Sequence, residues 1–135
     1  MNPPRIYVAA ASLEVQRAQR VMRDLRERGA HIVGDWTEAV LREGGDGARQ
    51  TDAQRALLSA EQLAEVTRAD GLLLLVPEDV ASVGTWIELG VAWRSQVPVV
   101  ASSLSPRLPW AAAWVTRVGT DEEAVRVMLR VVDGW

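Results

Sequence analysis

The stretch "GLLLLVP", residues 71–77, decides the fold, because it is a continuous apolar run closed by a proline. A run of this length is typical of a strand that is covered on both faces of a parallel sheet. A helical pattern stands on each side of it, from Thr51 or Asp52 to about Arg68 and over residues 84–95. We therefore expect the run to form a central strand of an α/β domain.

Strands and helices alternate in the same way toward both ends of the chain. We predict a first helix from Ser12, which can cap its start, to Arg28, with Gly29 able to end it. A last helix begins at Asp121, and the glycine-rich stretch 41–51 is expected to be a loop. The other predicted strands cover residues 5–11, 30–36, 97–102 and 114–118.

This alternation predicts a three-layer α/β fold of the flavodoxin-like, Rossmann-like kind, with a five-stranded parallel sheet in the order 2-1-3-4-5. The length of 135 residues suits one domain over residues 1–135. In such sheets the ligand crevice lies outside the carboxyl ends of the strands, between strands one and three. The loops after "IYVAAA" and after "LLLLVP" should therefore border the site, and Glu88 follows the second of them.

Composition excludes several kinds of protein. A hydrophobic fraction of 48% with 24% charged residues is typical of a globular domain. The absence of cysteine and the single histidine, His31, exclude disulfides and thiolate or histidine metal clusters. A net charge of -3 argues against a nucleic-acid surface. Because no run could span a bilayer and no secretory signal is evident, we expect a cytoplasmic protein that does not bind membranes.

Several segments together resemble the nucleoside 2-deoxyribosyltransferase superfamily, which includes the 2'-deoxynucleoside 5'-phosphate N-hydrolases. These segments are "IYVAAAS", "ADGLLLLV" and "SVGTWIELGVA", followed by "VPVV". Their order and spacing hold over about residues 5–101, and the most specific piece is "GTWIELG". The resemblance implies an enzyme that cleaves or transfers the N-glycosidic bond of a nucleoside or nucleotide without a metal or organic cofactor.

The resemblance assigns the central chemistry to Glu88, as the nucleophile that attacks the anomeric carbon. We expect the helix dipole to stabilise its anion, since we place it near a helix start. Without the resemblance, the sequence favours the simpler interpretation, in which Glu88 is a first-turn glutamate turned to solvent. Tyr7, the only tyrosine, lies on the first strand, and its hydroxyl could hold Glu88 in place. Its alternative role is that of a core aromatic with a hydrogen-bonded tip.

Ser82, Gly84 and Ser12 are candidates for binding substrate. The nucleoside transferases carry an aspartate at the position of Ser82 and the nucleotide hydrolases a serine, so the resemblance favours a 5'-monophosphate. A neutral hydroxyl beside backbone amides at a helix start can bind a phosphate. The serines could instead only cap their helices. The arginine that often accompanies phosphate near Ser12 in this family is missing.

One position departs from the family pattern, because Gln62 stands where the family usually has an aspartate. In the family that carboxyl group helps to protonate the departing base or to bind the substrate. Glutamine donates a hydrogen bond but delivers no proton, and Glu61 or Glu65 would have to substitute from other faces of the same helix. This departure leaves open a module that binds nucleotides without turnover. A Toll/interleukin-receptor-like NAD-cleaving domain is a third, less favoured alternative.

The tryptophans divide by position. Trp36, at the end of the second predicted strand, and Trp86, two residues before Glu88, are placed to stack on a base, although each could equally pack in the core. Trp93 is expected in the core. Trp110 and Trp114 flank a segment that in this family often lies near a subunit boundary, so the resemblance implies a homodimer.

Overall fold

The computed structural model describes residues 2–42, 52–76, 83–102 and 114–133. Five strands form one sheet, all parallel, in the order β2-β1-β3-β4-β5. This order and the three-layer α/β architecture confirm the prediction. The strands are β1 (Arg5–Ala9), β2 (His31–Ile32), β3 (Gly71–Leu75), β4 (Val99–Ser102) and β5 (Val115–Val118).

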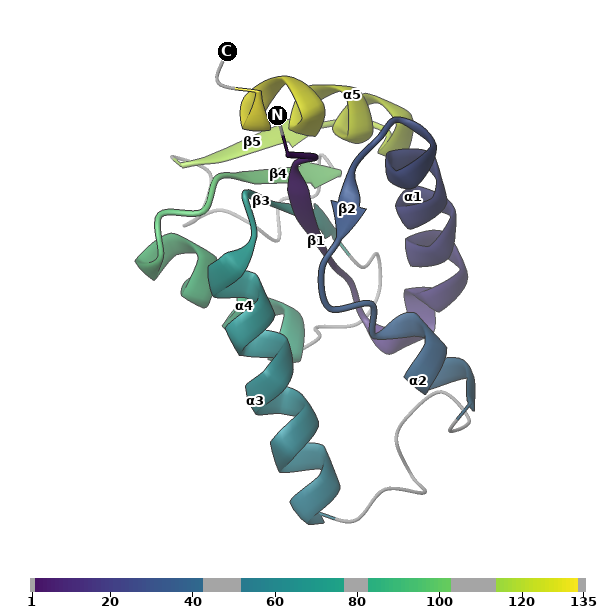
Figure 1. Cartoon of the computed structure of the whole chain (residues 1–135), viewed down its shortest axis with the longest axis vertical. Helices are drawn as coiled ribbons and strands as arrows, with labels where there is room; N and C mark the ends of the chain where they lie inside the picture. Colours follow the sequence, from purple (N-terminus) through teal and green to yellow (C-terminus); the bar gives the residue numbers. More distant parts are fainter. Residues whose placement is uncertain (1, 43–51, 77–82, 103–113, 134–135) are drawn as a thin grey trace.

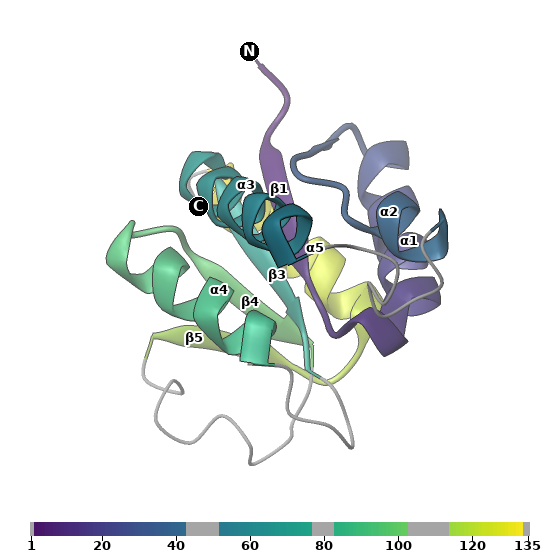
Figure 2. The same cartoon turned by 90° about the horizontal axis from the view of Figure 1, so that it is seen from below.

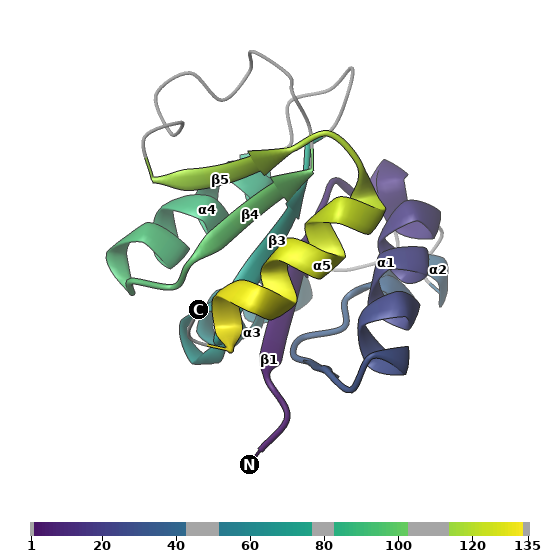
Figure 3. The ribbon, with the colours of Figure 1, turned by 90° about the horizontal axis from the view of Figure 1, so that it is seen from above.

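Helices cover both faces of the sheet (Figures 1 and 2). The helices α1 (Val15–Glu27) and α5 (Asp121–Val132) pack against one face, and Figure 3 shows α5 lying across the strands beside α1. On the opposite face lie α3 (Asp52–Arg68) and α4 (Val83–Arg94), which contact each other and the strands β1 and β3. None of the helices that the structure describes is long and apolar enough to cross a membrane.

The central strand β3 is buried along its whole length, as a strand covered by helices on both sides should be. It pairs with β1 so that Tyr7 lies beside Leu72. All residues of β1 after Arg5 are buried as well. The two strands that border the predicted crevice are therefore enclosed almost completely, like β4 beside them.

Most predicted boundaries agree with the structure to within two residues, and two differ by more. The second strand contains only two residues, because the chain turns at Gly34, which has a left-handed φ of 61°, and then begins the short helix α2 (Thr37–Arg42). We did not predict α2. The sequence feature that marks the start of α2 is Asp35, whose carboxylate accepts hydrogen bonds from the backbone amide and the hydroxyl of Thr37.

The first helix also begins differently. Ser12 does not cap it, since it opens a 3-10 turn, Ser12–Glu14, and no side chain caps either that turn or α1. Gly29 follows α1 with a φ of 94°, which agrees with its predicted place at the helix end. Most of the predicted loop 41–51 lies outside the described residues.

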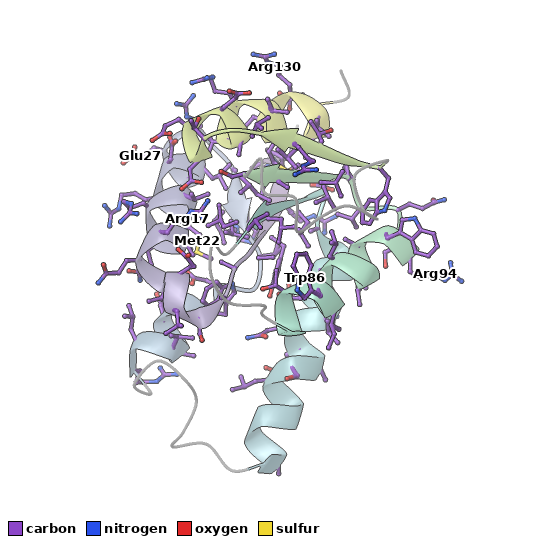
Figure 4. All side chains as sticks on the ribbon, turned by 180° about the vertical axis from the view of Figure 1, so that it is seen from behind. Arg17, Met22, Glu27, Trp86, Arg94 and Arg130 are labelled. Carbon is purple, nitrogen blue, oxygen red and sulfur yellow. The ribbon has the colours of Figure 1, made fainter. Side chains whose placement is uncertain are left out.

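A polar cluster fixes the carboxyl ends of β3 and β4 on the α1 and α5 face. The Arg17 guanidinium donates to both carboxylate oxygens of Asp121 and to the backbone carbonyls of Val76 and Ser102. The pKa of Asp121 is lowered: burial alone would raise it, but the hydrogen bonds from Arg17 and Ser102 outweigh burial. In Figure 4 Arg17 extends from α1 toward the strands, whereas Arg94 at the end of α4 extends away from them.

Candidate active site

Tyr7 and Glu88 meet inside the protein, although 81 residues separate them in the sequence. Tyr7 lies in the middle of β1 and is fully buried, and Glu88 on α4 is 8% exposed. The Tyr7 hydroxyl donates a hydrogen bond to Oε2 of Glu88. The parallel sheet brings this pair together, because α4 begins after β3 and packs over the same face that Tyr7 occupies.

Burial controls the charge of Glu88. It raises the pKa of Glu88 to about 7, and the hydrogen bond from Tyr7 acts in the opposite, lowering direction. Our expectation that the helix dipole would stabilise the anion is wrong, because Glu88 lies in the middle of α4 and the dipole acts mainly over the first turn. The alternative of a first-turn glutamate facing solvent is excluded by the same position and by its burial.

Tyr7 remains a proton donor under all ordinary conditions. Burial raises the pKa of its hydroxyl far above the usual value, and the charge of Glu88, the hydrogen bond to it and the charge of Glu65 add to this effect. The phenol is therefore protonated whenever Glu88 is ionised. The pair can hold one charge, on the carboxylate, with the tyrosine as its hydrogen-bond donor.

A cavity of about 270 Å³ opens beside this pair. Its walls come from β1, the segment after β1, α2, α3 and α4, so it lies at the carboxyl edge near the switch between β1 and β3. Its size is near the lower end of the range of small-molecule sites. Six of the predicted site residues contribute to its lining, namely Tyr7, Ser12, Trp36, Gln62, Gly84 and Glu88.

Two predicted site residues are not in this lining. Ser82 lies outside the described residues, so its proposed phosphate contact stays a prediction. Trp86, on α4, is half-buried and packs against the hydrophobic core. Trp36 belongs to both the core and the cavity: it is 8% exposed, and its indole Nε1 donates to the Val8 carbonyl at 2.8 Å.

Sequence reasoning missed several other lining residues. Val40 comes from α2, which we did not predict, and Thr85 is fully buried in the first turn of α4. Ser59 and Leu63 could have been predicted from the sequence, because they lie three positions before and one after Gln62 on α3. Helical spacing puts Ser59 on the face of Gln62, and this signal was available from the sequence.

Trp93 contradicts the expectation of a core residue, since it is 60% exposed. The reason is the rotation of α4, which buries Glu88, Leu89 and Ala92 and so turns the neighbouring Trp93 outward. Trp114 is half-buried, and Trp110 lies outside the described residues.

The carboxylates of α3 that we considered as substitutes for Gln62 do not line the cavity. Glu61 is exposed, and Glu65 forms an ion pair with Arg68 at 3.3 Å. Gln62 itself is half-buried and faces the cavity. Among the described lining residues Glu88 is thus the one carboxyl group.

The raised pKa of Glu88 predicts a pH-dependent cost in stability. In the unfolded chain the carboxyl group titrates near 4.5, and in the folded protein near 7. Below pH 4.5 both states hold the proton, and the folded protein bears no cost. As the pH rises through 7 the free energy of unfolding falls, because the unfolded state releases its proton first. The Glu88→Gln variant carries no such cost. It should be more stable than the parent at pH 8 by on the order of 2–3 kcal/mol, with most of this difference absent at pH 4.

Urea unfolding of both proteins at pH 4 and pH 8 measures this difference. An equal difference at the two pH values would show that Glu88 ionises normally in the folded protein.

Comparisons with known proteins identify the fold. No family model matches the sequence, and no curated protein matches it either. The structure is similar to that of the CMP N-glycosidase BcmB from Clostridium botulinum, with a TM-score of 0.58 and 16% identity over 94% of this chain and 98% of that chain.

Two further solved structures show the same likeness. BlsM gives a TM-score of 0.65 with 18% identity over 98% of this chain and 93% of that chain. A conserved protein from Enterococcus faecalis V583 gives 0.62 with 15% identity over 96% and 99%. These three structures show that the three-layer α/β fold of this chain is shared with the CMP N-glycosidase BcmB, with BlsM and with the Enterococcus protein.

Proposed function

We propose that this protein cleaves the N-glycosidic bond of a nucleoside 5'-monophosphate, or of the matching nucleoside, with Glu88 as nucleophile. The observation that carries the proposal is the buried hydrogen bond between Tyr7 and Glu88 at the wall of a cavity on the carboxyl edge of the sheet. A buried carboxyl group with a raised pKa is costly to maintain, and such groups cluster at functional sites. The shared fold with a CMP N-glycosidase supports the same chemistry.

The reaction proceeds in two steps. In the first, the ionised Glu88 attacks the anomeric carbon, the bond from this carbon to the base nitrogen breaks, and the electron pair leaves with the base. In the second, water attacks the same carbon, the bond from this carbon to Glu88 breaks, and the carboxylate is restored, while the proton that water loses neutralises the released base. An anion beside the oxocarbenium-like centre also stabilises both transition states. If a second base replaced water, the same residues would perform a transfer.

Tyr7 has a positioning role in this scheme. Its hydrogen bond engages Oε2 of Glu88, which leaves Oε1 as the attacking oxygen. The bond also lowers the pKa of Glu88 against the effect of burial, so that more of the protein carries the nucleophile at neutral pH.

Substrate binding would use the polar and aromatic groups of the remaining lining. Ser12 and the backbone at Gly84 are candidates for the phosphate, together with Ser82, and Trp36 and Gln62 are candidates for the base and sugar. We further propose that the protein acts as a cytoplasmic homodimer, as the family resemblance implies. No metal or organic cofactor takes part in the proposed reaction.

The rival proposal is a module that binds nucleotides without turnover. Gln62 favours it, because the described lining holds no carboxyl group besides the proposed nucleophile Glu88, so none is left to protonate the leaving base. General acid catalysis typically contributes 10²- to 10⁴-fold, so its absence would slow the reaction and not abolish it.

The pH dependence of base release tests the role of the Tyr7–Glu88 pair. The rate for the parent should rise with pH around a midpoint near 7, as Glu88 ionises. Tyr7→Phe removes a bond that favours the anion, so its midpoint should move to higher pH and its rate at pH 7 should fall. Glu88→Gln should release no base at any pH.

These rates are measured by chromatography of free base with nucleosides and their monophosphates as substrates. A midpoint that is unchanged or lower in Tyr7→Phe, or activity in Glu88→Gln within a few fold of the parent, would contradict the assignment.

The Gln62→Asp variant separates the enzyme from the binding module. It places a proton donor in the cavity wall at the position where the family has one, and base release should increase, toward about 10²-fold if the geometry suits. Adding Glu88→Gln to this variant should abolish the gain. Tight nucleotide binding with no free base from the parent or from Gln62→Asp would favour the binding module instead.

A further inference from the structure

Gly34 brings the backbone against the ring of Tyr7. Its φ of 61° is a conformation that favours glycine, and the chain there has no side chain to hold it away from β1. A Cβ atom at this position would lie only 3.0 Å from Cε2 of Tyr7. Contacts this short require the neighbouring group to move, so any larger residue here would displace the tyrosine ring or its surroundings.

The segment that contains Gly34 is fixed to β1 on both sides of Tyr7. The amide of Val33 donates to the carbonyl of Ile6 at 3.0 Å, and the indole of Trp36 donates to the carbonyl of Val8 at 2.8 Å. These carbonyls belong to the residues directly before and after Tyr7. Segment 33–36 is thus attached to the strand at two points, with Gly34 between them facing the ring.

The other side of Gly34 is closed by α3. The same added Cβ would lie 3.0 Å from Cβ of Glu65 and 3.2 Å from its Cγ. A side chain at position 34 would therefore meet Tyr7 and α3 at once. The charged groups that act on the Tyr7 hydroxyl are Glu88 from α4 and Glu65 from α3, and Glu65 is paired with Arg68.

From this packing we propose that Gly34 is a positioning residue for the proposed reaction: its bare Cα lets segment 33–36 support the Tyr7 ring so that the hydroxyl meets Glu88. The inference rests on the proposed function for its effect on activity. Its effect on the hydrogen bond between Tyr7 and Glu88 does not depend on that function. Gly34 therefore acts through Tyr7 without touching the substrate.

Gly29 provides a matched control. It also has a left-handed φ, 94°, but an added Cβ there would meet nothing within 4 Å. Gly29→Ala therefore introduces comparable backbone strain without a contact to Tyr7. Gly34→Asn is a second test variant, since asparagine tolerates this conformation better than alanine and still adds a Cβ.

The experiment measures two quantities in the parent, Gly34→Ala, Gly34→Asn and Gly29→Ala. The first is the pKa of Glu88, followed by NMR of its side-chain carboxyl carbon, and the second is kcat and KM for base release. In the Gly34 variants we expect the pKa of Glu88 to rise as in Tyr7→Phe, and kcat at pH 7 to fall on the order of 10- to 100-fold with a smaller change in KM. In Gly29→Ala the pKa of Glu88 should not move, and kcat should stay within about twofold of the parent.

A Glu88 pKa that stays constant in folded Gly34 variants would overturn the proposal. It would mean that α3 moves to accommodate the added side chain and that Tyr7 keeps its place. An equal shift in Gly29→Ala would overturn it as well, because strain alone would then explain the effect. If the pKa moves as expected but the parent releases no base, the positioning role stands and the proposed function fails.

Discussion

The hydrogen bond between Tyr7 and Glu88 is the interaction on which the account of this protein depends. A carboxyl group in the middle of an apolar helix would ordinarily be replaced by a hydrophobic residue, because its burial disfavours the charged form. Here burial raises the pKa of Glu88 to about 7, and the bond from Tyr7 limits that rise. Ionisation of the group therefore begins near neutral pH, which suits the proposed role of Glu88 as a nucleophile.

The fold supplies the rigidity that this balance requires. Tyr7 sits on a buried strand between β2 and β3, and the backbone at Gly34 lies so close to its ring that an added Cβ there would be 3.0 Å from it. On the opposite face of the sheet Arg17 joins the carboxyl ends of β3 and β4 to Asp121 at the start of α5. The edge that borders the cavity is therefore held on both faces, while the cavity itself is lined by side chains from five separate segments.

The sequence predicted the architecture well, because the patterns that carry it are local. The apolar run of β3 and the spacing of the helices were sufficient for the sheet order. Local patterns failed to predict which side chains are buried where tertiary packing sets the orientation of a helix. The rotation of α4 buries Glu88 and exposes Trp93, and no short-range pattern fixes that rotation. The left-handed turn at Gly34 ends β2 early for a similar reason, since it lies beside Tyr7, which is 27 positions earlier in the sequence.

The central claim is that Glu88 forms a covalent bond to the sugar, and trapping that intermediate tests it most directly. The protein would be incubated with a nucleoside 5'-monophosphate that carries 2'-fluorine, which slows both steps, and a base that leaves readily, which keeps the first step faster than the second. Its mass is then measured intact and after digestion. We predict a mass increase equal to the fluorinated sugar phosphate, located on the peptide that contains Glu88 and absent from Glu88→Gln. Release of base from the natural substrate with no adduct on Glu88, and with Glu88→Gln as active as the parent, would contradict the account.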